Sequence, residues 1–318
     1  MSKNLIVGFT GGIGRATAQS LSNRGEKVIA LVRDLNKAER YAAELQGIEI
    51  RQGDASRLQD VLSASENCSR LFYCANVPYP MWHTHTRELL KISIEAAVKN
   101  KLKFIFPGNV YVYGHPQQSL INEGHPHAAN TKKGQIRIDM ENMLFNTSRE
   151  SDFTYAIVRF PDFYGPFVIN GYYDQIFLHA LKGKKINWIG SLKVPQEFIF
   201  IEDAGEAMVI AGLSGKSNNM MFNVPGFSET TAREFLNEIV KQSRKKSKVS
   251  SINIPFLISI AGVFDKLIYE FSEMFYLKRE RLILNGALFR STFGTLPATP
   301  YAEGIKKTLL WTREFFKI

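Results

Sequence analysis

Short apolar runs alternate with longer amphipathic stretches from the beginning of the chain. Six of these runs are predicted to be strands, because most of their residues are apolar, as in strands covered on both faces. They span residues 5–9, 27–32, 48–52, 70–75, 103–106 and 154–159. Helical stretches fall between them, over residues 15–23, 87–99 and 134–145. Strands that alternate with helices predict an α/β fold with a doubly wound, mainly parallel sheet.

The second half of the chain follows a less regular pattern. After residues 164–166 the alternation is lost, except that residues 197–201 and 203–212 predict one more strand and helix. We therefore predict a first domain over residues 1–165 and a smaller, interleaved lobe over residues 166–318, with about residues 196–213 returning to the first domain. Aromatic residues at the start of the lobe are expected to be divided between core and pocket wall: Phe163, Tyr164, Phe167, Tyr172 and Tyr173.

The N-terminus and the apolar segments predict a cytoplasmic protein. Residues 1–4 lead directly into a predicted strand, without the charged and apolar regions of a secretory signal peptide. The most apolar later segment, residues 255–277, is a poor membrane span because it is interrupted by Asp265, Lys266, Glu270 and Glu273. An amphipathic helix is expected there instead, and its aromatic residues are expected to pack in the core or in the contact of a homodimer.

A formal net charge of +10 is compatible with nucleic acid, an acidic membrane surface or a small anionic ligand. Residues 244–248 (RKKSK) are expected to form a solvated helix end and loop, because no aromatic residues are interleaved with them. No nucleic-acid motif is found. Cys68 and Cys74 lack the spacing of a disulfide framework or a zinc site, and the histidines have loop-like neighbours, so no metal is expected. The expected partner is a small molecule.

Residues 7–15 (VGFTGGIGR) connect the first predicted strand to the first predicted helix. Gly8, Gly11 and Gly14 follow a G-x-x-G-x-x-G spacing rather than G-x-G-x-x-G. Glycines at such a turn let bare backbone approach a pyrophosphate, whose charge the helix N-terminus attracts. The turn therefore predicts a dinucleotide site. Its expected contacts are Gly8, Thr10, Gly11, Gly12, Ile13, Gly14 and Arg15.

Further motifs extend over nearly the whole chain. Residues 104–114 (FIFPGNVYVYG) are similar to F-x-S-S-x-x-V-Y-G, residues 158–166 (VRFPDFYGP) to V-R-P-x-N-x-Y-G-P, and residues 198–204 (FIFIEDA) to F-V-x-V-D-D-x-A. Together with the glycine spacing, these motifs resemble the extended and atypical members of the short-chain dehydrogenase/reductase superfamily, which includes nucleotide-sugar epimerases and dehydratases. The resemblance implies a Rossmann-type sheet with a C-terminal substrate lobe.

The resemblance also implies further cofactor contacts. The superfamily has a Gly-Asp pair after the third strand, whose Asp contacts the adenine. The end of its fourth strand lies beneath the cofactor, and its V-R-P-x-N-x-Y-G-P turn lies against the nicotinamide. The residues that match these places are Asp54, Ala55, Cys74, Ala75, Asn76, Pro161 and Phe163.

The end of the second predicted strand favours NADP(H) over NAD(H). In NAD-preferring relatives a carboxylate there binds the ribose hydroxyls, whereas this chain has Val32 followed by Arg33. A guanidinium can pair with a 2′-phosphate that a carboxylate would repel. Arg15 and Lys37 are expected to converge on the same phosphate. The alternative is an NAD site in which Asp34 binds the ribose.

The residues at the superfamily's catalytic positions are different in this chain. The resemblance places the usual Ser or Thr at Asn109, and the Tyr and Lys of Tyr-x-x-x-Lys at Lys133 and Arg137. Hydride transfer to a carbonyl needs a proton donor, so a non-standard active site is expected. Asn109 would donate a hydrogen bond to a substrate oxygen. The acid would be either Tyr111 or Lys133. Burial and the like charge of Arg137 would lower the pKa of Lys133. Asp162 would be a base or a substrate ligand.

Two functions are compatible with these residues. The predicted one is an NADP(H)-binding oxidoreductase or epimerase/dehydratase-like enzyme, which acts on a small carbonyl or hydroxyl compound such as a nucleotide sugar. The alternative is a catalytically inactive NADP(H)-binding sensor or regulatory module, which the missing Tyr and Lys favour.

Overall fold

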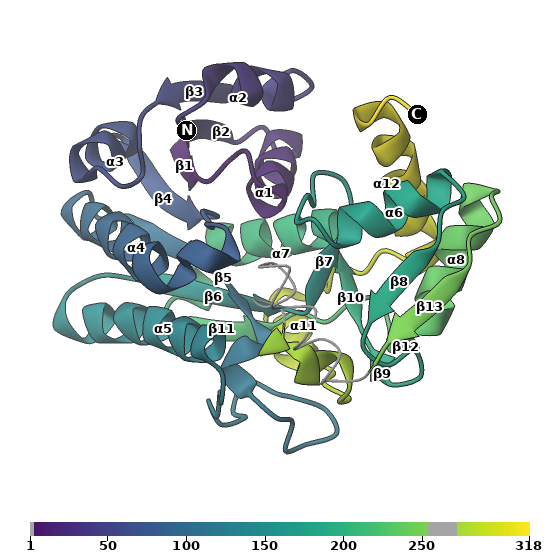
Figure 1. The fold of residues 1–318 in the computed structure, drawn as a ribbon. Helices are drawn as coiled ribbons and strands as arrows, with labels where there is room; N and C mark the ends of the chain where they lie inside the picture. The colour runs from purple at the N-terminus through teal and green to yellow at the C-terminus, as the bar shows by residue number, and fades with distance from the viewer. Residues whose placement is uncertain (1–2, 254–271) are drawn as a thin grey trace.

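A seven-stranded parallel sheet forms the centre of the molecule, in the order β11-β6-β5-β4-β1-β2-β3 (Figure 1). The computed structural model describes residues 3–253 and 272–318 of the chain. The strands of this sheet are β1 (Lys3–Val7), β2 (Lys27–Val32), β3 (Ile48–Gln52), β4 (Cys68–Tyr73), β5 (Lys103–Asn109), β6 (Tyr155–Phe160) and β11 (Met220–Asn223). All neighbouring strands pair in parallel, which confirms the predicted doubly wound sheet.

Helices cover both faces of the sheet and bury it between two apolar cores. The helices of one face are α3 (Leu58–Ser65), α4 (Trp82–Lys99) and α5 (Lys132–Glu150). Those of the other face are α1 (Gly12–Asn23), α2 (Leu35–Ala42), α7 (Ile201–Leu213) and α11 (Ala287–Phe293). Strand β6 is buried along its whole length, as expected for an apolar strand covered on both sides.

The strand order reverses at β1, and this reversal creates the crevice of the fold. The chain builds β2 and β3 on one side of β1 and then crosses to β4 on the other side. In doubly wound sheets, ligands bind outside the carboxyl ends of the strands at such a reversal. The backbone N–H of Cys74, just after β4, donates to the carbonyl oxygen of Val7 at 2.7 Å. The two predicted cofactor segments that follow β1 and β4 therefore meet at this crevice.

A smaller lobe lies beside the sheet, at the right of Figure 1, and has an apolar core of its own. Its helices are α6 (Tyr173–Leu181), α8 (Ala232–Ser243) and α12 (Tyr301–Phe315). Its short strands are β7 (Asp162–Tyr164), β8 (Ile186–Ile189), β9 (Pro195–Gln196), β10 (Phe198–Phe200), β12 (Thr230–Thr231) and β13 (Val249–Ile252), paired as β7–β10, β8–β13 and β9–β12. The 3-10 helices of the chain are η1 (Tyr79–Met81), η2 (Val110–Tyr113), η3 (Gly215–Ser217) and η4 (Phe275–Lys278).

The lobe and the sheet are interleaved through more segments than the sequence predicts. The strand expected at residues 197–201 is β10, which pairs with β7 outside the central sheet. The strand that joins the central sheet is β11, beside β6. Helix α7 packs on α1, where a Cβ on Gly205 would lie 2.5 Å from the carbonyl carbon of Ala16. Most of the helix predicted over residues 255–277 falls outside the described residues.

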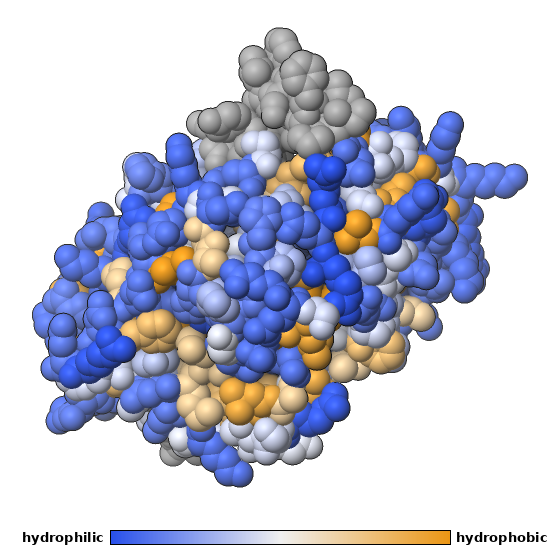
Figure 2. Space-filling model, turned by 90° about the horizontal axis from the view of Figure 1, so that it is seen from below, coloured by the Kyte–Doolittle hydropathy of each residue, from blue (hydrophilic) through white to orange (hydrophobic). Residues whose placement is uncertain are grey.

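The basic cluster of residues 244–248 lies at the surface, as the sequence predicts. Arg244 is the C-cap of α8, and Arg244, Lys245, Lys246 and Lys248 are exposed, as expected for a helix end and loop. The face in Figure 2 is largely hydrophilic, with apolar residues in small separate groups. Within residues 3–253 and 272–318, every helix is too short or too polar to cross a membrane.

A buried ion pair links β6 to α5. Arg159 and Glu141 are both fully buried, and the guanidinium donates to both carboxylate oxygens, through Nε at 3.0 Å and through Nη2. Arg159 also donates to the hydroxyl of Tyr113 at 2.9 Å, and that hydroxyl donates to the side chain of Asn223 in β11 at 2.6 Å. Removing either charge should destabilise the protein strongly, because the other charge would then be buried without a partner.

We predict that Glu141→Gln lowers the free energy of unfolding by about 3–5 kcal/mol, because it leaves the buried Arg159 charge without its carboxylate. Urea denaturation followed by circular dichroism measures the change. The control is Asp139→Asn, which breaks the part-exposed pair with Arg87 (3.1 Å) and should cost less than about 1 kcal/mol. Similar losses in the two variants would contradict the role given to the buried pair.

Candidate functional site

The turn between β1 and α1 depends on two positions that lack a side chain. Gly8 has a φ of 93°, and a Cβ there would lie 2.5 Å from the backbone nitrogen of Ala75. A Cβ on Gly14 would lie 2.2 Å from the carbonyl oxygen of Gly8. A Cβ on Gly11 would lie 3.5 Å from that oxygen, which is an ordinary contact. Gly8 and Gly14 therefore fix how closely strand, turn and helix approach one another.

The N-terminus of α1 fits an anionic group. Gly11 is the N-cap, so no side chain accepts a hydrogen bond from the first N–H groups of the helix. The first turn of α1 also carries no acidic residue. N–H groups at a helix start attract phosphates through hydrogen bonds and through the helix dipole. With bare, exposed backbone at Gly11 and no capping side chain, this turn fits the diphosphate of a dinucleotide.

The segment after β7 borders the same turn. A Cβ on Gly12 would lie 3.1 Å from the carbonyl oxygen of Phe167, so this part of the turn packs against the chain's own backbone. Phe167 has a φ of 63°, which is uncommon for a residue other than glycine. Its ring contacts Tyr41 of α2, with centroids 4.7 Å apart, and Trp311 of α12, at 5.2 Å. Phe167 thus joins the sheet to the lobe beside the cofactor turn.

Two of the three cations predicted to bind a 2′-phosphate lie beside this aromatic cluster. Arg15 is 6% exposed, with its guanidinium 5.2 Å from the ring centroid of Phe167, and its Nε has no hydrogen-bond partner among the described residues. Burial lowers the pKa of Arg15. The ammonium of Lys37 lies 5.4 Å from the ring centroid of Tyr41. Arg33 is exposed just after β2. Arg15 and Lys37 therefore flank one aromatic pair, Phe167 and Tyr41.

The carboxylates near the same crevice already have partners. Asp34 caps α2 by accepting the backbone N–H of Lys37 at 3.0 Å. Asp54 accepts the backbone N–H of Ser56 at 2.9 Å and its hydroxyl at 2.8 Å. The bond from the Ser56 N–H lowers the pKa of Asp54, and the charge of Arg33 adds to this effect. Among the other predicted contacts, Cys74 and Pro161 are buried, Asn76 is exposed, and Thr10, Ile13, Ala55, Ala75 and Phe163 are partly buried.

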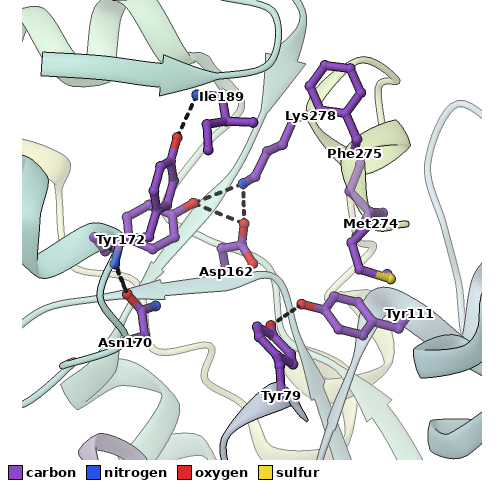
Figure 3. Close-up of a pocket in the computed structure, with 11 residues that line it drawn as sticks. Tyr79, Tyr111, Asp162, Asn170, Tyr172, Ile189, Met274, Phe275 and Lys278 are labelled. Atoms are coloured by element: carbon purple, nitrogen blue, oxygen red, sulfur yellow. Dashed lines mark hydrogen bonds and ion pairs between the residues drawn. The ribbon is translucent and has the colours of Figure 1, made fainter. Parts of the chain in front are cut away.

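A pocket lies between the sheet and the lobe (Figure 3). It holds about 540 Å³ of empty space, its opening to solvent included. Residues 162–170 connect it to the cofactor turn: Asp162 and Asn170 line the pocket, while Phe167 between them contacts Gly12. The lining residues are Tyr79, Tyr111, Asp162, Asn170, Tyr172, Tyr173, Ile189, Met274, Phe275, Leu277 and Lys278.

Two tyrosines form a hydrogen-bonded pair in the pocket. The hydroxyls of Tyr79 and Tyr111 are 2.9 Å apart. Burial raises the pKa of Tyr79 to about 12 and raises the pKa of Tyr111 well above its ordinary value. Both phenols are therefore protonated at neutral pH. Asn109 does not line the pocket; its side chain caps η2 by accepting the backbone N–H of Tyr111 at 3.2 Å.

A second polar group in the pocket joins β7, α6 and η4. The ammonium of Lys278 pairs with the carboxylate of Asp162 and donates to the hydroxyl of Tyr173 at 2.9 Å. That hydroxyl donates to Asp162 at 2.9 Å. Burial, together with the negative charge of Asp162, raises the pKa of Tyr173 well above its ordinary value. The ammonium also lies 5.0 Å from the ring centroid of Trp188.

Lys133 and Arg137, which the sequence motifs place at the superfamily's Tyr and Lys positions, make contacts that the sequence does not predict. Lys133 is buried and forms an ion pair with Glu273, and its ammonium lies 5.3 Å from the ring centroid of Tyr79. Arg137 donates through Nη2 to the carbonyl oxygen of Pro107 at 2.6 Å. Burial lowers the pKa of Arg137. Lys133 is thus paired with a carboxylate, whereas the sequence predicts only the like charge of Arg137 beside it.

The structure adds residues to the site that sequence reasoning did not select. Tyr79 lies between two prolines shortly after β4, and this position is the only feature of the sequence that could have indicated a place in the site. Phe275, Leu277 and Lys278 come from η4. Together with Met274, they lie far along the chain from the rest of the lining, and no spacing pattern connects the two groups. The aromatic residues at the start of the lobe divide as expected, because Tyr172 and Tyr173 line the pocket whereas Tyr164 is in the core.

Comparisons with known proteins agree with this geometry. The model of the NAD dependent epimerase/dehydratase family matches residues 4–224. A UDP-glucose 4-epimerase of Thermotoga maritima, solved with UDP-glucose, is 17% identical and covers 99% of both chains with a TM-score of 0.78. An epimerase of Methanothermobacter thermautotrophicus is 16% identical, covers 99% of this chain and 93% of its own, and has a TM-score of 0.83. A dTDP-glucose 4,6-dehydratase of Bacillus anthracis, solved with NAD, is 16% identical over 99% and 97% of the chains, with a TM-score of 0.80.

A search of curated protein sequences finds no match. Because the solved structures share fewer than one residue in five with this chain, they support the fold alone. The family model, however, spans the glycine turn, η2, α5 and β11. The chain therefore belongs to the NAD dependent epimerase/dehydratase family.

We predict that Gly14→Ala destabilises the protein while Gly11→Ala does not. The new Cβ would overlap the carbonyl oxygen of Gly8 in the first variant and would make an ordinary contact in the second. Thermal unfolding followed by circular dichroism tests this pair, and we expect a lower melting temperature for Gly14→Ala alone. Equal melting temperatures in both variants would show that the turn tolerates a wider approach than the structure requires.

Proposed function

We propose that this protein is an NADP(H)-dependent enzyme of oxidoreductase or epimerase/dehydratase type with a non-standard active site in the pocket of Figure 3. The observation that carries this proposal is the continuity of residues 162–170, which line the pocket at both ends and contact the cofactor turn between them. A substrate in the pocket would lie next to the turn that seats the diphosphate. The cofactor would supply or accept a hydride, which is the chemistry of pyridine nucleotides.

Three features support NADP(H) as the cofactor. Arg15 is a buried cation whose guanidinium donates to Gln19 at 3.0 Å and lies 3.7 Å from the carboxylate of Glu44. Its Nε lacks a hydrogen-bond partner among the described residues, and an added anion there would stabilise it. Arg33 and Lys37 lie at the start of α2, where a ribose phosphate would bind. Asp34, the carboxylate that an NAD site would use, is already the cap of α2.

We predict that the wild-type protein binds NADPH more tightly than NADH. Arg33→Ala and Lys37→Ala should each weaken NADPH binding about tenfold or more and leave NADH binding unchanged, because each removes a charged hydrogen bond to the 2′-phosphate. Fluorescence titration measures both affinities. Arg40→Ala, at the other end of α2, is the matched control and should change neither affinity. Tighter binding of NADH by the wild type would reverse the assignment.

Tyr111 is the proposed proton donor. In the direction of reduction, the C=O double bond opens as a hydride reaches its carbon, and the Tyr111 hydroxyl gives its proton to the oxygen. Tyr79, 2.9 Å away, then donates to the resulting phenolate and stabilises it. Lys133 lies over the ring of Tyr79 as a fixed positive charge, with Glu273 as its counter-ion. The raised pKa of Tyr111 keeps its proton in place until the substrate oxygen becomes negative.

We predict that Tyr111→Phe lowers turnover by about 10²–10⁴-fold without changing NADPH affinity, because it removes the general acid alone. Tyr79→Phe should have a smaller effect, since Tyr111 keeps its hydroxyl. Loss of NADPH is followed in a screen of carbonyl compounds and nucleotide sugars. Unchanged turnover in Tyr111→Phe would show that another group is the acid.

The same screen separates the enzyme from an inactive module. Lys133 and Arg137, at the positions of the superfamily's Tyr and Lys, favour a protein that binds the cofactor without turning a substrate over. NADPH binding with no turnover of any compound would support a sensor or regulatory function. Turnover that depends on Tyr111 would exclude it.

A further inference from the structure

We infer that the pocket takes an uncharged carbonyl compound or alcohol with a flat, largely apolar body, rather than the hexose of a nucleotide sugar. This inference rests on the proposed function, because it concerns the pocket that holds Tyr111. It is carried by three properties of the lining residues: their apolar surfaces, their internal hydrogen bonds and their charge balance.

The walls of the pocket offer mainly aromatic and aliphatic surfaces. In Figure 3, Tyr111, Met274 and Phe275 lie along one side of the pocket, and Tyr172 and Ile189 lie across from them. A flat apolar group between these side chains would leave water, and the burial of its apolar surface favours binding. Well-placed contacts between aromatic rings strengthen this binding further. A polyhydroxylated ring would gain far less from the same walls.

The tyrosine hydroxyls of the lining and the side-chain oxygen of Asn170 are already hydrogen-bonded within the protein. Tyr79 and Tyr111 bond to each other, and the hydroxyl of Tyr172 accepts the backbone N–H of Ile189 at 2.8 Å. The side-chain oxygen of Asn170 accepts two backbone N–H groups of the start of α6, at 3.0 and 2.9 Å. A hexose carries several hydroxyls, and each of them needs a new partner when it leaves water. A single carbonyl needs only the hydroxyl of Tyr111.

The charges of the lining also cancel. Asp162 and Lys278 are the two charged side chains among the described lining residues, and they are paired with each other. A carboxylate or a diphosphate that entered would lose its hydration without finding an unpaired opposite charge among the described lining residues. An uncharged compound avoids this cost.

Binding of three probes to the full chain with NADP⁺ present tests the inference. The probes are acetophenone, its para-carboxylate 4-acetylbenzoate, and UDP-glucose, each measured by isothermal titration calorimetry. We expect acetophenone to bind at least about tenfold more tightly than 4-acetylbenzoate, and more tightly than UDP-glucose. Equal or tighter binding of either charged probe, or no binding of acetophenone, overturns the inference.

Variants test the charge balance directly. Asp162→Asn leaves Lys278 without its carboxylate and should shift the preference toward 4-acetylbenzoate by about tenfold, whereas Lys278→Met should shift it in the opposite direction. Asp139→Asn makes the same change as Asp162→Asn outside the pocket and should leave the preference as it is. A preference that moves in neither pocket variant overturns the charge argument.

NADPH titration of the same samples keeps the two proposals apart. If NADPH does not bind, the proposed function fails. If NADPH binds and UDP-glucose is preferred to acetophenone, the proposed function stands and the substrate class alone is wrong.

Discussion

The contact between Gly14 and the carbonyl oxygen of Gly8 is the constraint on which the cofactor side of the molecule depends. A side chain at Gly14 would separate α1 from β1, and one at Gly8 would push the turn away from the end of β4. The separation of these elements sets the width of the crevice at the strand reversal. Because the segment after β7 packs on Gly12, the same turn also positions one border of the substrate pocket.

A second constraint fixes the position of η2, the short helix that carries Tyr111. The buried pair of Arg159 and Glu141 connects β6 to α5, and its bond to Tyr113 reaches η2, which also carries Tyr111. Asn109 fixes the other end of η2 through its bond to the Tyr111 N–H. The proposed acid is therefore held by a short helix that is anchored on both sides. Such anchoring limits the motion of a group that must meet a substrate oxygen at hydrogen-bond distance.

The sheet could be predicted from the sequence because strands buried on both faces consist mainly of apolar residues. The turn could be predicted because its glycines have a fixed spacing. The pairing of β10 with β7 could not be predicted, because a three-residue strand is too short for its sequence to indicate which strand it pairs with. Tyr111 was found by its place beside Asn109. Lys278 was not, because its contact with Asp162 joins residues separated by 116 positions in the chain. Local spacing carries no information about such contacts.

The cofactor turn and the proposed active site are constrained in different ways. The turn is constrained by close backbone contacts at Gly8 and Gly14. Lys133 is instead a buried cation paired with Glu273, and the half-buried Arg137 is bonded to the carbonyl oxygen of Pro107. Lys133 held in this way brings positive charge near Tyr79, which lines the pocket. In the proposed mechanism, the phenol pair beside this positive charge would do what a tyrosine and a lysine do in the superfamily, so the proposed activity does not require those two residues.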